Sequence, residues 1–349
     1  MLDDGKNLAA VLRSKKNIEL LFLNDPELSS QQVRVKIKYT ALCGTQVGEW
    51  LQSRGVDNYL PHCLGHEAVG EIIETHPDVQ GFNLGDKVVV SWIRNQPSSS
   101  AISPRYSGTS ANRNLTPETI NAGQCCTFMC RAIVPVDRVT KINVPELKPY
   151  HSLLGCALLT AYANFIAMES RLVNSEMRVA IWGLGGIGLA TALILATKGF
   201  QLDVFEPNAE LSENERALLR IKNIYKTFSS SKIEEYDVAV VTIGSASALE
   251  EAQMSLKQNA GKLFISANLP YGVSMALDLK PLLYGREVIG VGERFIRPEN
   301  DIPKLLSILE GFIEVNKLLV EGLYPLDQIN DVIKGLQEAG GKRRVFDII

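Results

Sequence analysis

The stretch from Arg178 to Asn208 has the residue spacing that points most directly to chemistry. A short apolar run is followed by glycines at G-x-G-x-x-G spacing, an apolar helix-like segment and a second apolar run. In a strand, turn, helix and strand unit, such glycines allow a tight turn, close approach of a pyrophosphate and close helix packing. The alternative is a glycine-rich turn in an ordinary α/β sheet, but the context favours a dinucleotide site. The residues predicted to form it are Gly183, Gly185, Gly186, Ile187 and Gly188.

Glu206 closes the second apolar run and predicts which dinucleotide binds. It follows the first glycine by 206 − 183 = 23 residues, close to the roughly 20 expected for a carboxylate that binds a ribose diol. A negative charge at this position repels a 2′-phosphate, so NAD is favoured over NADP.

A second chemical group is spread over the first half of the chain. Cys43 stands in ALCGT, His66 and Glu67 in LGHEAVG, and Cys156 in LLGCALLT. Two thiolates and one imidazole suit zinc and leave a fourth tetrahedral position open for a substrate. Buried cysteines without a metal are the alternative, because free cysteine is often a core residue.

The elements that position these residues change in character near Tyr150. Residues 8–40 alternate apolar and polar positions, and short apolar runs continue through 64–93 and 126–144, which predicts a β-rich domain. From Arg178 onward, buried strands alternate with helices as a parallel sheet requires. Amphipathic helices are predicted at 301–316 and 329–339, and 344–349 is predicted to be a strand that returns to the first domain. Residues 94–124, rich in proline, serine and glycine, are predicted to be a long loop.

Composition excludes several classes of protein. The 349 residues are 46% hydrophobic and 21% charged with a net charge of -3, which gives no electrostatic reason to expect nucleic acid or an anionic membrane as a partner. No apolar run approaches a membrane span, and no secretory signal is expected. The six cysteines lack the pattern of a disulfide framework, so a reducing, cytoplasmic setting is expected.

Taken together, these motifs resemble the zinc-dependent medium-chain dehydrogenase/reductase (alcohol dehydrogenase) family. The resemblance covers nearly the whole chain, and its most specific parts are GHEAVG, GDKV, LLGC and GLGGIG. It implies a GroES-like β-rich catalytic domain of residues 1–157 and 293–349, a Rossmann NAD-binding domain of residues 158–292, and an active site between them. It also implies a hydride transfer between NAD(H) and an alcohol, aldehyde or ketone.

The resemblance further implies individual roles. Cys43, His66 and Cys156 would bind one catalytic zinc, with Glu67 as an alternate ligand, and zinc would act as a Lewis acid on the substrate oxygen. The remaining residues implied are Thr45 as a proton relay, Trp92 as a wall of the substrate pocket, Thr160 behind the nicotinamide ring and Arg344 at the cofactor pyrophosphate.

Three departures from the family pattern stand out. Gln46 occupies a position where an aspartate usually supports the metal site, and Gly48 one where a relay histidine often stands. The region where many relatives hold a structural zinc has no cysteine quartet, so we expect one zinc per chain. Cys125, Cys126 and Cys130 follow that region and are predicted to be core or pocket-wall residues.

Two other functions remain open at this stage. A metal-free reductase of activated double bonds has the same architecture but lacks the ligand set. A non-catalytic dinucleotide-binding protein is suggested by Gln46 and Gly48.

The sequence predicts the substrate and the partners only in general terms. Several arginines in or near the variable loops make a sugar- or phosphate-bearing substrate an option, and the resemblance implies a homodimer or homotetramer. The arginines are Arg54, Arg94, Arg105, Arg294 and Arg297.

Overall fold

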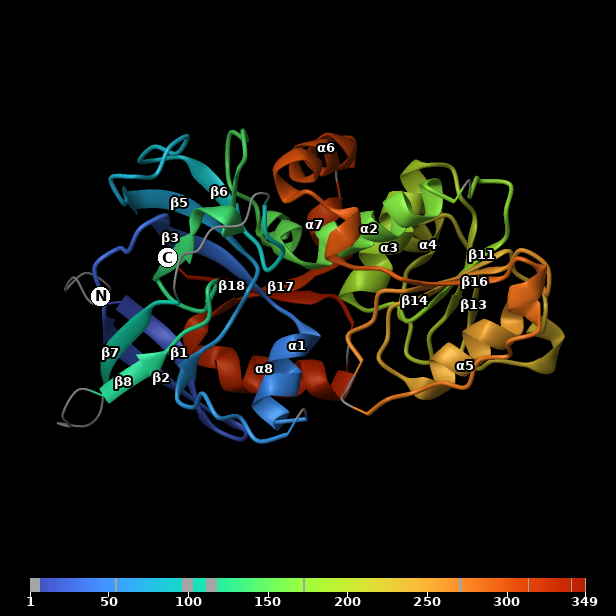
Figure 1. The fold of residues 1–349 in the computed structure, drawn as a ribbon, viewed down its shortest axis with the longest axis horizontal. Coiled ribbons are helices and arrows are strands. Elements are labelled where there is room, and N and C mark those ends of the chain that lie inside the picture. The colour runs from blue at the N-terminus through green and yellow to red at the C-terminus, as the bar shows by residue number, and fades with distance from the viewer. Residues whose placement is uncertain are drawn as a thin grey trace. The chain divides into compact units, whose positions relative to one another are not determined.

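The computed structural model describes residues 7–53, 55–95, 103–110, 118–171, 173–269, 272–312, 314–339 and 341–348. The chain divides into two compact units (Figure 1). Unit 1 comprises Met1–Cys156, Arg297–Ser307 and Ile313–Ile349, and unit 2 comprises Ala157–Ile296 and Ile308–Phe312. Arg54 lies outside the described residues.

Unit 1 is built from two β-sheets. One is a closed barrel in the order β1-β2-β7-β8-β4, and the other has the order β10-β6-β5-β3-β18-β17 with β9 paired to β3. The strands are β1 (Asn7–Ser14), β2 (Asn17–Asn24), β3 (Gln32–Leu42), β4 (His62–Cys63), β5 (Ala68–Thr75), β6 (Lys87–Val90), β7 (Arg105–Ser110), β8 (Glu118–Asn121), β9 (Arg131–Pro135), β10 (Val139–Lys141), β17 (Val320–Pro325) and β18 (Arg343–Asp347).

The core of unit 1 explains the predicted alternation. Leu12, Leu21, Val35 and Phe128 are fully buried in one cluster that joins both sheets. Apolar side chains that alternate along a strand fall on one face, so burial of that face selects the strand register. The β-rich first domain is therefore confirmed, and β18 returns to it by pairing with both β3 and β17, as predicted.

The prediction of one long loop over residues 94–124 is wrong in part. Strands β7 and β8 lie in this range and complete the barrel, with Tyr106 and Ile120 buried. Gly108 belongs to this packing, because a Cβ there would lie 2.6 Å from the Leu23 side chain. The small residues that allow this close strand packing are also common in loops, so the composition of the segment indicated a loop. Residues 96–102 and 111–117 lie outside the described residues.

In unit 1, helices α1 and α8 pack against each other, and η2 packs against β3 and β5 (Figure 1). Helix α8 confirms the prediction, but the single helix predicted at 301–316 is divided into α6 and α7, and α1 was not predicted. The helices are α1 (Gly44–Leu51), η1 (Val136–Arg138), η2 (Pro149–Gly155), α7 (Val315–Leu319), η6 (Leu326–Gln328) and α8 (Ile329–Ala339), while α6 (Pro298–Glu310) begins in unit 1 and ends in unit 2.

Unit 2 is a parallel six-stranded sheet in the order β13-β12-β11-β14-β15-β16, which confirms the Rossmann-like, doubly wound α/β prediction. The order reverses beside β11, and helices α3 and α5 cover opposite faces (Figure 1). The elements are α2 (Ala157–Glu169), β11 (Val179–Trp182), α3 (Gly186–Thr197), β12 (Leu202–Phe205), α4 (Glu213–Leu218), β13 (Ile221–Tyr225), η3 (Ser230–Lys232), β14 (Val238–Val241), α5 (Ala246–Ser255), β15 (Lys262–Ile265), η4 (Pro281–Tyr284), β16 (Glu287–Gly290) and η5 (Glu293–Phe295).

Within the described ranges, no single helix is long and apolar enough to cross a membrane. The bent pair η2 and α2 meets the length and apolarity criterion only when its two helices are taken together.

Candidate metal and dinucleotide sites

Four side chains with metal-ligating atoms meet in unit 1. The ligating atoms of Cys43, His66, Glu67 and Cys156 all lie within 4.8 Å of one another. Cys43 follows β3 and precedes α1, His66 and Glu67 precede β5, and Cys156 follows η2. The structure therefore brings together the ligand group that the sequence predicted from three separate segments.

Close backbone packing holds these segments in register. The Glu67 carbonyl accepts hydrogen bonds from the Thr40 hydroxyl at 3.0 Å and from the Ala41 N–H at 3.1 Å. A Cβ at Gly155 would lie 2.3 Å from the Val90 carbonyl oxygen, so only glycine lets the segment before Cys156 approach β6 this closely. The motif residues around the ligands thus serve packing as well as chemistry.

The surroundings of the two thiols shift their pKa values in opposite directions. A hydrogen bond from Cys156 lowers the pKa of Cys43 well below its usual value despite burial, and Arg343 and His66 lower it further. The same hydrogen bond and burial raise the pKa of Cys156. Of the two thiols, Cys43 is therefore the one that loses its proton more readily. Metal binding releases the protons that the two thiols carry, because both sulfurs ligate as thiolates.

Arg343 is a site residue that the sequence reasoning missed. Its side chain is buried, its Nη1 donates to the Leu42 carbonyl at 3.1 Å, and the same nitrogen lies 3.9 Å from Glu67 Oε1. Burial lowers the pKa of Arg343, but the charges of Cys43, Glu67 and Cys156 outweigh burial and raise it. This guanidinium balances the negative charge of the ligand group.

Gln46 connects the helix start to the imidazole. Its Oε1 accepts from the Cys43 N–H at 3.2 Å, and its Nε2 lies 2.8 Å from His66 Nδ1. Burial lowers the pKa of His66, whereas the interaction with Cys43 more than offsets this and raises it.

The residues present fit a zinc ion. His66 Nε2 is buried and has no hydrogen-bond partner of normal geometry within the part of the chain that the structure describes, while the ring interacts electrostatically with Cys43. Two sulfurs, one imidazole nitrogen and one carboxylate form a donor set that suits zinc in proteins.

Two predicted neighbours of the ligands lie in the same unit. The Thr45 hydroxyl is 3.7 Å from the Cys43 sulfur, a distance typical of a sulfur hydrogen bond. Trp92 follows β6 and is partly buried. Its backbone N–H donates to the Gly155 carbonyl at 3.3 Å.

The glycine turn in unit 2 has the geometry of a phosphate-binding loop. Gly183 has a φ of 91°, a left-handed conformation that favours glycine. A Cβ at Gly188 would lie 2.0 Å from the Gly183 carbonyl oxygen, so the start of α3 packs directly on the turn. Gly185 precedes α3, and Gly186 and Ile187 are in its first turn, where free N–H groups attract anions.

Glu206 lies beside that turn at the end of β12. Its carboxylate accepts from the Leu184 N–H at 3.0 Å and from the Asn208 N–H at 3.1 Å. A cavity of about 270 Å³ is lined by Glu206, Gly183, Lys226 and Ile243, among others. Ile243 is 42% exposed, which leaves an apolar surface at this cavity.

Thr160 and Arg344 have different surroundings. Thr160 is buried on α2 of unit 2. The Arg344 guanidinium pairs with Glu321 at 3.0 Å and donates to the Val332 carbonyl at 2.8 Å, both in unit 1. The Arg344 guanidinium thus has an ion pair and a carbonyl acceptor within its own unit, and its contact with a cofactor pyrophosphate stays a prediction.

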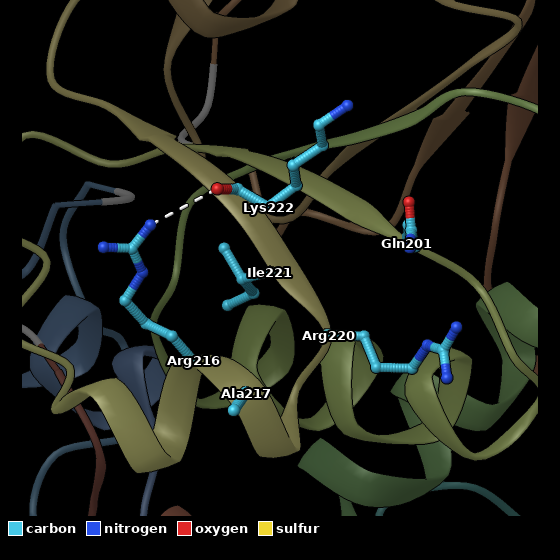
Figure 2. Close-up of a pocket in the computed structure, with 6 residues that line it drawn as sticks. All are labelled: Gln201, Arg216, Ala217, Arg220, Ile221 and Lys222. Carbon is cyan, nitrogen blue, oxygen red and sulfur yellow. Dashed lines mark hydrogen bonds between the residues drawn. The ribbon is translucent and has the colours of Figure 1, made fainter.

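A second hollow in unit 2, of about 440 Å³, contains basic side chains but does not gather them (Figure 2). Arg216 donates to the Lys222 carbonyl at 3.3 Å, while the charged ends of Arg220 and Lys222 point away from each other. The arrangement does not make a convergent anion site.

The other cysteines have core-like surroundings. Cys126 is buried, and its sulfur lies 3.1 Å from the Cys63 carbonyl, while Cys125 and Cys130 are partly buried. Burial raises the pKa of Cys63 to about 12 and that of Cys125 to about 11, which makes these thiols poor nucleophiles and ligands.

Two of the loop arginines form hydrogen bonds within their own units. Arg94 donates to Gln124 at 2.7 Å, and Arg294 donates to the Gly290 carbonyl at 3.1 Å.

Comparisons with known proteins agree with this architecture. The "Alcohol dehydrogenase GroES-like domain" family matches residues 29–144. The chain is 28% identical to "Alcohol dehydrogenase-like 2" of Arabidopsis thaliana over 99% of this chain and 98% of that protein. It is also 28% identical to an alcohol dehydrogenase of Geobacillus stearothermophilus, over 93% of this chain and 94% of that protein.

A solved structure gives the same overall chain path. Benzyl alcohol dehydrogenase from Acinetobacter calcoaceticus superposes with a TM-score of 0.81 at 22% identity, over 99% of each chain. The fold, the ligand group and the full-length relatives agree in making the chain similar to the medium-chain zinc alcohol dehydrogenases. It is accordingly an oxidoreductase of the alcohol dehydrogenase type.

Proposed function

We propose that the protein is a zinc- and NAD-dependent dehydrogenase that interconverts a small primary or secondary alcohol and its aldehyde or ketone. The observation that carries the proposal is the convergence of Cys43, His66, Glu67 and Cys156 within 4.8 Å. In unit 2, a glycine turn and a ribose-binding carboxylate supply the second half of the required chemistry.

Zinc would be held by Cys43, His66 and Cys156, with Glu67 nearby as an alternate ligand. When bound, zinc supplies a Lewis acid for the substrate oxygen, and NAD supplies the hydride acceptor. Arg343 offsets the charge that the thiolates and Glu67 bring into a buried place.

Thr45 is the residue proposed to move the substrate proton. Its hydroxyl can accept a proton from an alcohol and donate its own onward, which a side chain in hydrogen-bond reach must do in acid-base transfer. Gly48 supplies no side-chain group for the next step.

NAD is proposed over NADP because of Glu206. Both of its oxygens are fixed by backbone N–H groups beside the glycine turn, so the charge cannot easily move away from a 2′-phosphate. Lys226 lines the same cavity and supplies a charge of the opposite sign. Thr160 is proposed behind the nicotinamide, Trp92 in the substrate pocket, and the assembly as a homodimer or homotetramer.

A panel of alcohols and carbonyl compounds, scored by NADH absorbance, tests the proposal. Turnover that requires zinc and is lost in Cys43→Ser is expected. Reduction of activated double bonds by zinc-free protein would favour the metal-free branch. NADH binding without turnover of any panel member would favour a non-catalytic dinucleotide-binding protein.

A further inference from the structure

The Gln46 side chain has two partners, one backbone group and one side chain. It is the third residue of α1, its side chain is 1% exposed, and its Oε1 accepts the Cys43 N–H at 3.2 Å. This is the reciprocal half of a helix-capping box. Its Nε2 is consequently directed to His66 Nδ1 at 2.8 Å.

The capping bond determines which amide atom faces the imidazole. A backbone N–H only donates, so the reverse orientation would place the Gln46 Nε2 donor against the Cys43 donor. An amide nitrogen also only donates, and His66 Nδ1 must therefore accept. A neutral ring that accepts at Nδ1 carries its proton on Nε2, the atom that is buried without a hydrogen-bond partner among the described residues.

Zinc requires the opposite arrangement. A neutral imidazole that ligates through Nε2 carries its proton on Nδ1, and metal-bound histidines normally give that N–H to a carboxylate or carbonyl. Here that proton would meet the amide donor of Gln46. Either the amide turns and loses its bond to Cys43, or two donors are left facing each other in a buried place.

We propose that Gln46 is a positioning residue that holds His66 in the tautomer opposed to metal binding and so weakens the zinc affinity of this chain. The proposal rests on the zinc site proposed above. The side chain acts only through His66 and needs no contact with substrate. Removal of the amide donor should strengthen zinc binding, with or without an added charge.

Competition for zinc against a chromogenic chelator tests this in the full-length chain. Gln46→Glu keeps the acceptor for Cys43 and offers a second acceptor to His66, so we expect at least about tenfold tighter zinc binding. Gln46→Met removes the donor without adding charge, and we expect affinity above wild type. Gln46→Met binding zinc equally or more weakly would overturn the proposal.

Glu215→Met is the matched control. Glu215 is the third residue of α4, and its carboxylate accepts from the Ser212 N–H at 2.9 Å in a comparable capping box. Its loss should leave zinc affinity unchanged.

Nitrogen-15 spectra of the histidine rings in the metal-free wild type give a second, independent measurement, which stands even if a Gln46 variant does not fold. We expect His66 to carry its proton on Nε2, and a protonated Nδ1 would overturn the proposal. Failure of the zinc site itself is distinguishable, because Cys43→Ser would then bind zinc as tightly as wild type.

Discussion

Arg343 Nη1 lies 3.9 Å from Glu67 Oε1, and both side chains are buried near Cys43. A buried cation and anion at this distance depend on each other, because neither has water to solvate it. The charge balance of the ligand group is thus built into the fold before any metal binds.

Arg343→Met tests this charge balance. Loss of the guanidinium leaves Glu67 and Cys43 uncompensated, so we expect about 3–5 kcal/mol less free energy of unfolding in the metal-free chain, measured by urea denaturation. Adding Glu67→Gln should restore part of this loss. Lys317→Met, at an exposed ion pair, is the control and should cost about 0.5 kcal/mol or less. Equal effects at both sites would refute the coupling.

Gly188→Ala tests the packing of α3 on the glycine turn. The added Cβ would lie 2.0 Å from the Gly183 carbonyl, so the helix start must move away from the turn. We expect a loss of about 1–3 kcal/mol in stability and at least tenfold weaker NADH binding, followed by fluorescence. Gly290→Ala has no atom within 4 Å of the added Cβ and should bind NADH normally. Normal binding by Gly188→Ala would show that this close contact is not needed.

Glu206→Gln tests the choice of dinucleotide. The amide keeps an acceptor but removes the charge that repels a 2′-phosphate, so the NAD to NADP affinity ratio should fall by about tenfold, or ~1.4 kcal/mol. Glu251→Gln changes a carboxylate in the same cavity that accepts from Trp182 Nε1 at 3.3 Å, and the ratio should change little. A ratio unaffected by Glu206→Gln would assign the preference elsewhere.

His151 predicts a pH dependence of stability. Burial first, and Lys148 second, lower its pKa from 6.5 to about 4, and its Nδ1 accepts the Lys148 N–H at 3.0 Å. Between these values the unfolded chain binds a proton that the folded chain does not, so stability falls as pH is lowered from about 6.5 to 4, by at most about 3 kcal/mol. His151→Asn should flatten this part of the curve, measured by denaturation across the range. An unchanged slope would remove His151 as its source.

The sequence predicted the ligand group because each ligand stands in a short motif at the end of a strand. The sequence did not determine whether Arg343 or Arg344 lies beside the ligand group. Neighbouring residues of a strand point to opposite faces, so a shift of one residue decides which arginine reaches Glu67 and which reaches Glu321.

Strand β7 and the orientation of the Gln46 amide could not be predicted from the sequence for related physical reasons. Strand β7 uses Gly108 for close packing, and its composition resembles a loop. Gln46 was recognised as unusual from sequence, but the direction of its amide follows from the Cys43 N–H at the start of α1. Hydrogen-bond direction is a property of paired groups, and one residue type does not determine it.

The zinc content of purified chain, measured together with NAD-linked alcohol oxidation, tests the central claim most directly. We predict one zinc per chain, with zinc and activity lost together in Cys43→Ser and both retained in Cys125→Ser. Two zinc ions per chain, or activity that survives in zinc-free Cys43→Ser, would contradict the account.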